Sequence, residues 1–463
     1  MKVLLVSIYE LGHPPFGLAE PAAWLRARNN EVRSLDLAVE DFDESSFRWA
    51  DLIAFYLPMH TATRLAARLI PRARALNASA HLAAYGLYAP MNEGYLRRLG
   101  VRTVLGGEFE AGLAALAERL SRGEEWPEGS QPEPSISTAK QRFLVPDRSD
   151  LPPLDRYARL LLPNGEERVA GYVEASRGCK HHCRHCPIVP IYEGRFRIVP
   201  REIVLADIRQ QVEVGARHIT FGDPDFLNGP AHAFAIVRGM HKEFPDLSYD
   251  ATIKVEHLLA AGESLRVLKD TGCLFITTAV ESFDESVLVR LDKRHTRADV
   301  YRVVRLLKAL DLALSPTFVP FTPWTTLAGY RDLLSNLAEL DLVNAVTPVQ
   351  LSIRLLIPPG SKLLDLDDIH VYLAPLDEEA LSYPWSNPDP RVDALQAEVQ
   401  ALAQGEEGRA RGEIFARIRD LAHTYAGLVA PPLPLSSRDR FTPRLSEPWY
   451  CCAEPTDDQL ASV

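Results

Sequence analysis

Three cysteines stand close together in the segment SRGCKHHCRHCP, at positions 179, 183 and 186. Their spacing, C-x3-C-x2-C, puts three thiols on one short loop directly after a strand-like segment. Three thiolates on such a loop can bind three irons of a [4Fe–4S] cubane, which leaves the fourth iron open to a small chelating ligand. The loop therefore predicts an iron–sulfur centre held by Cys179, Cys183 and Cys186.

Zinc is the main alternative for this loop. Structural zinc takes four ligands, and His181, His182 or His185 could supply the fourth. Zinc loops usually come in two paired halves, however, and the only pair of adjacent cysteines elsewhere in the sequence is Cys451 and Cys452. Simple core cysteines are disfavoured because the flanking residues are basic and polar. We therefore expect iron and sulfur.

Length and composition describe a globular protein of several domains. A chain of 463 residues is too long for one ordinary core, so two or three domains are expected. The net charge of −11 argues against broad binding to nucleic acids or anionic membranes, which favours a small-molecule substrate. No apolar run reaches the roughly 18 residues of a membrane-spanning helix, and the N-terminus lacks the cleavage site of a signal peptide. We expect a cytoplasmic protein, in which clustered cysteines favour metal or redox chemistry.

Residues 1–121 alternate between apolar strand-like runs and amphipathic helix-like segments. Strands that are apolar on both faces and separated by helices predict a Rossmann-like, doubly wound parallel sheet. Ligands of such sheets bind beyond the carboxyl ends of the strands. We therefore expect a ligand near Tyr9, Leu57, Gly86 and Gly107, which lie at the ends of predicted strands.

The remaining chain divides into three segments. Residues 122–166 are rich in proline and polar residues, which predicts an extended linker. In residues 167–375, six strand candidates alternate with helix-like segments, which predicts a partial (β/α)6 barrel with its site at the carboxyl ends of the strands. Residues 376–463 contain a helix rich in Ala, Glu and Arg, followed by a proline-rich tail.

The cysteine loop resembles that of the radical S-adenosylmethionine (radical SAM) superfamily. That family carries C-x3-C-x-φ-C on the first barrel strand, and His185 stands at the φ position, which is usually aromatic. The resemblance implies that S-adenosylmethionine (AdoMet) binds the open iron through its amino and carboxylate groups. It also implies that an external electron donor of the flavodoxin or ferredoxin type reduces the cluster, which then cleaves AdoMet to a 5′-deoxyadenosyl radical.

Residues at the ends of other barrel strands fit the same family pattern. Gly222, Asp223 and Asp225 follow the second strand, where the family binds the AdoMet amino group, although an Asp-Pro turn would equally explain them. Glu281 and Ser282 follow the fourth strand, where a polar pair would meet the ribose hydroxyls. The alternative is that this pair caps the next helix.

Arg354 ends the sixth strand candidate. An arginine inside an apolar run needs an anionic partner. The carboxylate of AdoMet or of a substrate would serve, and so would a structural ion pair. The sequence leaves both interpretations open.

A Rossmann-like domain ahead of a radical SAM barrel resembles the cobalamin-binding class of that superfamily. Residues 1–121 lack the motif D-x-H-x-x-G that accompanies a histidine ligand to cobalt, and His13 and His60 lie outside that context. Either cobalamin binds without a histidine ligand or the domain is degenerate. Nucleotide binding is a weaker hypothesis, because no G-x-G-x-x-G follows the first strand.

The cysteine pair near the C-terminus lies in the sequence CCAEP, residues 451–455. The whole chain resembles the CUAEP/CCAEP-tail radical SAM proteins, some of which carry selenocysteine at the second position. The resemblance implies that Cys452 is a working thiolate and Cys451 its resolving partner. An incidental exposed pair is the alternative. The proline-rich stretch 430–448 is long enough to carry the pair to the barrel mouth.

Together these features predict a radical SAM enzyme. The first hypothesis is methyl or alkyl transfer through cobalamin to a small molecule, with Cys451 and Cys452 assisting. The second is hydrogen abstraction without cobalamin, with sulfur, selenium or thiophilic-element chemistry at the tail. The third is an iron–sulfur or zinc protein without enzymatic activity.

Overall fold

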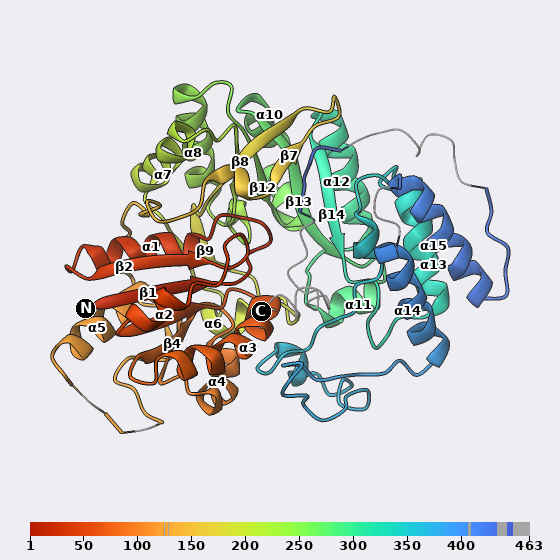
Figure 1. Cartoon of the computed structure of the whole chain (residues 1–463). Helices are drawn as coiled ribbons and strands as arrows, with labels where there is room; N and C mark the ends of the chain where they lie inside the picture. Colours follow the sequence, from red (N-terminus) through yellow and green to blue (C-terminus); the bar gives the residue numbers. More distant parts are fainter. Residues whose placement is uncertain (125, 128, 406–408, 433–441, 448–463) are drawn as a thin grey trace.

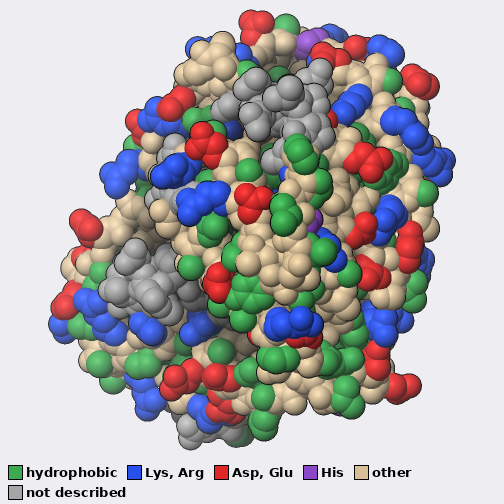
Figure 2. Space-filling view, turned by 90° about the vertical axis from the view of Figure 1, so that its right-hand side faces the viewer, with side chains coloured by type: hydrophobic (Ala, Val, Ile, Leu, Met, Phe, Trp, Pro, Cys, Tyr) green, Lys and Arg blue, Asp and Glu red, His purple; other side chains and the backbone are tan. Residues whose placement is uncertain are grey.

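The computed structural model describes residues 1–124, 126–127, 129–405, 409–432 and 442–447. An N-terminal α/β domain lies beside a larger barrel-like domain, and two C-terminal helices cover the far side of the latter (Figure 1). On the face of the molecule in Figure 2, Lys and Arg side chains are interspersed with Asp and Glu. No helix in these ranges is both long and apolar enough to cross a membrane.

The N-terminal domain is a parallel sheet of six strands in the described residues, in the order β2-β1-β3-β4-β5-β6. The strands are β1 (Lys2–Ser7), β2 (Glu31–Asp36), β3 (Leu52–Tyr56), β4 (His81–Tyr85), β5 (Thr103–Gly107) and β6 (Ile136–Ser137). The helices are α1 (Phe16–Arg26), α2 (Glu44–Trp49), α3 (His60–Leu76), α4 (Glu93–Leu99) and α5 (Glu110–Ser121), with a 3-10 turn η1 (Pro90–Asn92). This confirms the predicted doubly wound sheet.

Alternating residues of each strand supply the two cores of this domain. Leu4 and Val6 of β1 face α2, α3 and α4, whereas Val3 and Leu5 face α1 and α5. Because helices cover both faces, the strands are apolar throughout their length. Because β1, β3, β4 and β5 are parallel, their carboxyl ends meet at one edge of the sheet.

The second domain is built on a curved sheet of seven strands in the described part of the chain, in the order β14-β13-β12-β11-β8-β7-β15. These are β7 (Arg159–Leu161), β8 (Glu167–Val173), β11 (His218–Phe221), β12 (Ser248–Thr252), β13 (Cys273–Glu281), β14 (Ala313–Phe318) and β15 (Arg444–Leu445). Strands β8 and β11 to β14 are parallel, and β7 and β15 add antiparallel edges. A hairpin of β9 (Ser176–Gly178) and β10 (Phe196–Ile198) follows β8.

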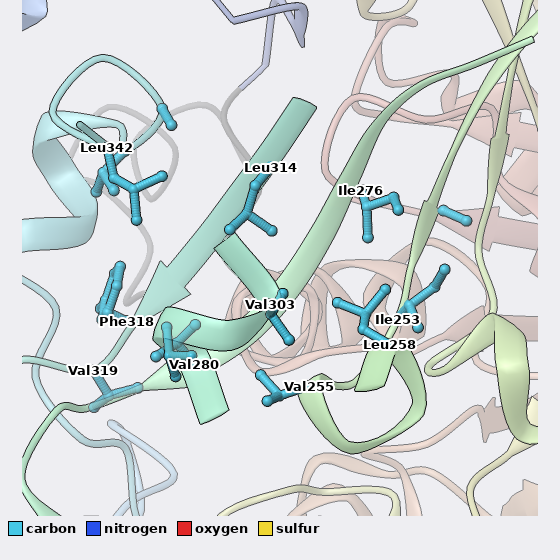
Figure 3. Close-up of a cluster of buried hydrophobic side chains, with 14 of the residues drawn as sticks. Ile253, Val255, Leu258, Ile276, Val280, Val303, Leu314, Phe318, Val319 and Leu342 are labelled. Carbon is cyan, nitrogen blue, oxygen red and sulfur yellow. The ribbon is translucent and has the colours of Figure 1, made fainter. Parts of the chain in front are cut away.

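Helices cover the outside of this sheet. They are α7 (Arg201–Glu213), α8 (Pro230–Glu243), α9 (Val255–Ala261), α10 (Arg266–Asp270), α11 (Glu285–Arg290), α12 (Arg297–Ala309) and α13 (Leu327–Glu339). The short helix α6 (Val189–Tyr192) instead follows the cysteine loop and contacts β5 of the N-terminal sheet. The 3-10 turns are η2 (Leu154–Arg156), η3 (Phe226–Asn228), η4 (Gly262–Leu265), η5 (Pro348–Leu351) and η6 (Lys362–Asp365). Figure 3 shows Ile276 of β13, Leu314 of β14 and Val303 of α12 in the buried cluster that joins the two layers.

Three details differ from the sequence-based expectations. The sixth strand candidate makes one isolated parallel bridge, between Phe321 and Arg354, because a 3-10 turn at Pro348 interrupts the extended chain. The expected linker contributes β6 to one sheet and β7 to the other. The single helix expected after residue 376 is two helices, α14 (Pro390–Gly405) and α15 (Arg411–Tyr425).

Candidate active site

A pocket of about 420 Å³ lies between the two domains. Glu10, Met59, Tyr88 and Phe109 line it from the strand ends of the N-terminal domain. The cysteine loop and the strand ends of the barrel line it from the other side. The two sites that the sequence predicted separately, one at each sheet, therefore share one cavity.

Cys179, Cys183 and Cys186 all line this pocket, Cys183 buried and the other two half-buried. Backbone hydrogen bonds fix the loop, from Cys186 N to the carbonyl of Cys183 and from Arg184 N to the carbonyl of Leu291. The three sulfur atoms do not all lie within 4.8 Å of one another. Thiolates on one zinc ion would lie about 4 Å apart, given Zn–S bonds of about 2.3 Å. The wider spacing suits separate corners of a cubane.

A polar cluster lies beside Cys179. Asp225 Oδ2 is 2.6 Å from His257 Nδ1 and 3.6 Å from His181 Nε2, and the two histidine rings approach within 3.3 Å. Burial, followed by the charge of Lys254, lowers the pKa of His181 to about 4. The buried Nζ of Lys254 has no hydrogen-bond partner among the described residues. The sequence had indicated Asp225, but His257 and Lys254 carried no motif.

Asp223 has a structural role in this arrangement. Its two carboxylate oxygens accept hydrogen bonds from Ser176 Oγ at 2.5 Å and from Ala175 N at 2.9 Å, which ties the turn after β8 to the end of β11. Burial raises the pKa of Asp223 to about 7. At Gly222 an added Cβ would lie 2.0 Å from the hydroxyl of Tyr172, so only glycine fits. These contacts favour the turn interpretation of Gly222 and Asp223.

His185 and Glu281 form a buried charged group with Lys293. Glu281 Oε1 lies 3.1 Å from His185 Nε2 and 3.4 Å from Lys293 Nζ. Burial opposes ionisation, but the charge of Lys293 and the contact with His185 lower the pKa of Glu281 to about 2. Negative charge on Glu281, Cys183 and Cys186 raises the pKa of Lys293 against the effect of burial. Lys293 therefore keeps a positive charge beside the cysteine loop.

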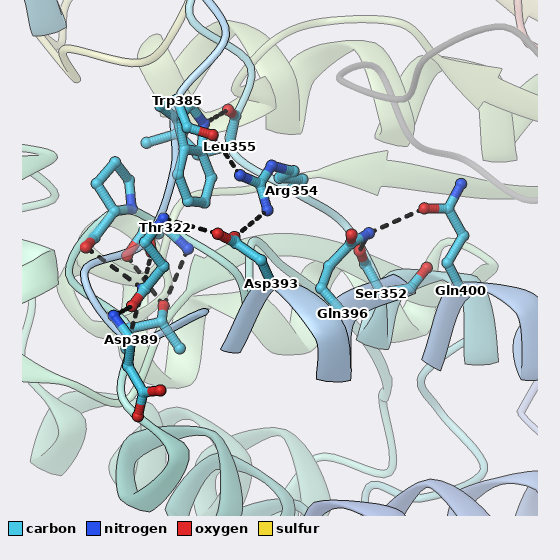
Figure 4. Close-up of polar contacts among 12 residues, drawn as sticks. Thr322, Ser352, Arg354, Leu355, Trp385, Asp389, Asp393, Gln396 and Gln400 are labelled. Carbon is cyan, nitrogen blue, oxygen red and sulfur yellow. Dashed lines mark hydrogen bonds and ion pairs between the residues drawn. The ribbon is translucent and has the colours of Figure 1, made fainter. Parts of the chain in front are cut away.

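Two predicted site residues of the barrel, Ser282 and Arg354, lie outside the pocket lining. Ser282 Oγ accepts a hydrogen bond from Asp284 N, and Asp284 caps α11, so Ser282 belongs to the helix entry. Arg354 donates to Asp393 Oδ1 at 2.7 Å and to the carbonyl of Trp385, whose ring lies beneath the guanidinium (Figure 4). Of the two interpretations left open for Arg354, the structure shows the ion pair.

The predicted ligand positions of the N-terminal domain are close to the pocket, but only Gly107 lines it. Gly107 has φ +72°, and an added Cβ would lie 2.1 Å from the carbonyl of Ser137. Leu57 is fully buried, and Gly86 packs against the carbonyl of Leu57. The lining is formed mainly by the residues that follow these positions in the chain: Glu10, Pro58, Met59, Leu87 and Tyr88.

Glu447 extends the site beyond anything expected from the sequence. The short strand β15 pairs with β7, and Thr442, Pro443, Arg444, Leu445 and Glu447 all line the pocket. The hydroxyl of Tyr9 donates to Glu447 Oε1 at 2.9 Å, which joins the last described segment to the N-terminal domain. Cys451 and Cys452 lie outside the described residues.

Residues 173–323 match the family description Radical SAM superfamily. The protein contains a radical SAM domain. The matched region contains the cysteine loop and strands β11 to β14. A radical SAM domain implies a [4Fe–4S] cluster and AdoMet as cofactors, in agreement with the chemistry expected from Cys179, Cys183 and Cys186.

Curated relatives match this chain in part of their length. The ribosomal protein uS12 methylthiotransferase RimO of Geobacter sulfurreducens is 24% identical over 38% of this chain and 41% of its own. The hopanoid C-3 methylase of Methylococcus capsulatus is 24% identical over 67% of this chain and 61% of its own. The chain spans 38% to 42% of the first three curated relatives that it matches.

Solved structures share the fold of this chain. TsrM from Kitasatospora setae, a radical SAM methyltransferase, is 18% identical, with a TM-score of 0.58 over 73% of this chain and 71% of that one. OxsB, described as a cobalamin-dependent AdoMet radical enzyme, is 16% identical, with a TM-score of 0.67 over 92% and 71%. The second alignment covers both domains and supports the two-domain architecture.

Arg177, two residues before Cys179, joins the two domains of the protein. Its buried guanidinium contacts Glu20 of α1, Glu110 of α5 at 2.6 Å and Glu174 at 2.7 Å. Glu108 lies 3.7 Å away. One cation is thus surrounded by four carboxylates, and it fixes the orientation of the cysteine loop against the N-terminal domain.

The excess of carboxylates around Arg177 makes stability sensitive to pH. Burial raises the pKa of Glu108 to about 7, and repulsion from Glu110 adds to this although Arg177 opposes it. When the pKa of a carboxyl is higher in the folded state than in the unfolded state, the free energy of unfolding is highest below the unfolded-state pKa. It falls as the pH rises through 7. We expect Glu108→Gln to be more stable than the wild type by about 1–2 kcal/mol at pH 8. Urea unfolding at pH 8 and pH 5 tests this, because the difference should vanish at pH 5.

Proposed function

We propose that this radical SAM enzyme transfers a methyl or alkyl group to a small molecule with the aid of cobalamin bound by the N-terminal domain. The observation that carries the proposal is the shared pocket, which places the strand ends of the N-terminal domain opposite the cysteine loop. The net charge of −11 and the interspersed surface charges support a small molecule over a nucleic acid (Figure 2). An external donor of the flavodoxin or ferredoxin type would supply electrons.

The side chains around the cysteine loop suit an iron–sulfur cluster. Cys179, Cys183 and Cys186 would bind three irons, and the pocket leaves room at a fourth. Lys293 would offset the negative charge of the thiolates, since Glu281 holds it in place beside them. His185 is fixed by the same carboxylate.

The polar cluster beside Cys179 suits AdoMet. Lys254 Nζ is buried in the pocket lining, 3.7 Å from Glu256 Oε2, and none of the described residues accepts a hydrogen bond from it. A buried ammonium group without hydrogen bonds favours a further anion beside it. The AdoMet carboxylate would provide that anion. Asp225, held by His257, would accept from the AdoMet amino group.

The N-terminal sheet suits a large cofactor at its carboxyl edge. Glu10, Met59, Tyr88 and Phe109 face the cysteine loop across the pocket. The motif D-x-H-x-x-G is absent from the sequence, so we expect cobalamin to bind without a histidine ligand. When bound, AdoMet and cobalamin supply the radical and methyl-transfer chemistry, and the protein positions them and excludes water.

The test of this function uses the full-length protein, reconstituted anaerobically with iron and sulfide. With AdoMet and reductant it should form 5′-deoxyadenosine, and it should bind added cobalamin stoichiometrically. AdoMet labelled in its methyl group should then transfer label to a small molecule of a cell extract, detected by mass spectrometry. AdoMet cleavage without cobalamin binding would instead support hydrogen abstraction without cobalamin.

The tail cysteines are proposed to assist the same reaction. Glu447 lines the pocket, and five further residues of chain span at most about 18 Å, so Cys452 lies within reach of the site. We expect Cys452→Ser to lower product formation at least tenfold while uncoupled AdoMet cleavage continues. Thr456→Ala, in the same tail, should behave as the wild type. Product formation at the normal rate in Cys452→Ser would show that the tail is not catalytic.

A further inference from the structure

The inside of the barrel carries polar side chains where such barrels are usually filled by Val, Ile and Leu. Successive side chains of a strand point to opposite faces of the sheet. Ile276 of β13 and Leu314 of β14 belong to the buried cluster under the outer helices (Figure 3). Their neighbours Thr277 and Ser315 therefore face the inside, where they line the pocket between the domains. Polar side chains at this depth favour a polar ligand.

Asp250 of β12 is a charged member of this polar interior. It lines the pocket and is 4% exposed. Its Oδ1 accepts hydrogen bonds from His218 Nε2 at 2.9 Å and from Thr220 Oγ1 at 2.7 Å. Its Oδ2 makes no hydrogen bond to any residue that the structure describes. One carboxylate oxygen thus fixes the side chain, and the other is available to a ligand in the pocket.

The protein does not neutralise the charge of Asp250. Within the described ranges its ion-pair partner is His218, and no Lys or Arg forms an ion pair with it. His218 Nδ1 lies 2.9 Å from Ser248 Oγ, closer than the carbonyl of Arg217 at 3.3 Å, and Arg168 donates to the same Oγ. The Ser248 hydroxyl therefore donates to Nδ1, and Nε2 donates to Asp250. In this tautomer His218 is neutral and the carboxylate keeps its negative charge.

A row of hydroxyl groups accompanies Asp250. Thr252 follows Asp250 by two residues on the same face of β12, and it pairs with Thr277, which pairs with Ser315. All three line the pocket, and their hydroxyls form no hydrogen bond within the described part of the chain. Neighbouring strands are about 4.8 Å apart, so adjacent hydroxyls can contact one small group. An ammonium group has three N–H donors and no acceptor, which suits a carboxylate oxygen flanked by hydroxyl oxygens.

We propose that the substrate carries an ammonium group, which binds Asp250 Oδ2 inside the barrel. This inference rests on the proposed function, because it names the class of substrate that enters the same pocket. A buried carboxylate without a neutralising partner destabilises the protein, and a cationic hydrogen-bond donor offsets that cost. Asp250 lies within β12, whereas Asp225 and Lys254, which suit AdoMet, lie beyond the ends of β11 and β12. The substrate is thus an organic amine, held in the barrel by its charge.

The experiment measures thermal unfolding of the full-length protein with methylammonium, tetramethylammonium or sodium chloride at equal ionic strength. We expect methylammonium to raise the unfolding temperature by about 1 °C or more, as for any ligand that binds only the folded state. Tetramethylammonium has the same charge but no N–H donor, and should behave as sodium does. Absence of a response to methylammonium, or an equal response to both organic cations, would overturn the inference.

Asp250→Asn should lose the methylammonium response. Asparagine keeps an acceptor for His218 and Thr220 but replaces the negative oxygen by an amide. Asp246→Asn makes the same chemical change at an exposed position just before β12, and it should keep the response. Thr277→Val leaves Asp250 intact, and we expect it to weaken the affinity for methylammonium about threefold or more. An unchanged response in Asp250→Asn would contradict the inference.

Further measurements separate the substrate from AdoMet, which has an ammonium group of its own. The reconstituted Asp250→Asn protein should bind AdoMet as tightly as the wild type. A loss of that affinity would assign Asp250 to AdoMet and overturn the inference. The methylammonium response needs no AdoMet cleavage, so a responsive protein that forms no 5′-deoxyadenosine would contradict the proposed function alone. Transfer of label to a product without an amino group would contradict the inference alone.

Discussion

Replacing Cys183 by alanine is expected to abolish reductive cleavage of AdoMet completely. Cys183 is the middle cysteine of the loop and is 7% exposed, so no solvent ligand can easily take its place. A cluster held by two thiolates instead of three would lose iron. The purified variant should lack the broad visible absorption of an iron–sulfur cluster, contain little iron and sulfide, and form no 5′-deoxyadenosine.

Cys273 provides the matched control for this experiment. It is buried at the start of β13, outside the pocket lining, and its thiol contacts the carbonyl of Phe275. Cys273→Ala removes a thiol of the same chemistry but leaves the cysteine loop intact. It should keep the full iron content and the normal rate of AdoMet cleavage. A Cys183→Ala protein with the same properties would show that these cysteines do not hold the cluster.

Local sequence patterns were sufficient to predict the two sheets and their order in the chain. Apolar runs separated by amphipathic helices predicted both sheets, because strand burial on two faces leaves a continuous apolar signature. The cysteine loop was predicted to follow the first barrel strand, and the structure places it after β8 and the short β9. Its metal chemistry could be proposed from the sequence because the three cysteines lie within eight residues of one another.

Contacts between distant segments could not be predicted in the same way. His257 and Lys254 join Asp225 only because β11 and β12 are neighbours in the sheet, and neither residue belongs to a local motif. Arg354 appeared equally suited to a ligand or to an ion pair, and its partner Asp393 lies on a helix 39 residues away. The sequence gives the residue type, whereas the direction of the side chain depends on the tertiary fold.

The part of the pocket lining that the C-terminal segment forms could not be predicted from the sequence either. Thr442 to Glu447 were part of a proline-rich stretch without periodicity. The segment reaches the pocket because β15 adds to the free edge of β7, and an unpaired strand edge accepts any extended segment of suitable length. That pairing places Arg444 in the pocket lining and brings Glu447 to Tyr9.

Replacing Arg177 by methionine is expected to have the largest effect on stability. Methionine fills a similar volume but leaves Glu20, Glu108, Glu110 and Glu174 buried without their cation. Removing one partner of a buried charged group costs about 3–5 kcal/mol. Urea unfolding should report this loss at pH 8. Arg48→Met, which removes an exposed ion pair with Glu44, is the control and should cost about 0–1 kcal/mol.

The pH dependence of the Arg177→Met loss distinguishes lost charge from lost packing. Without the guanidinium the raised pKa values of Glu20, Glu108 and Glu174 rise further, so the variant is most stable where these groups are protonated and loses stability as the pH increases. The difference from the wild type should therefore be small at pH 5 and large at pH 8. A loss of equal size at both pH values would mean that Arg177 acts through packing alone. Because Arg177 lies two residues from Cys179, the charge mechanism also predicts slower cluster incorporation at pH 8, measured as iron uptake during anaerobic reconstitution.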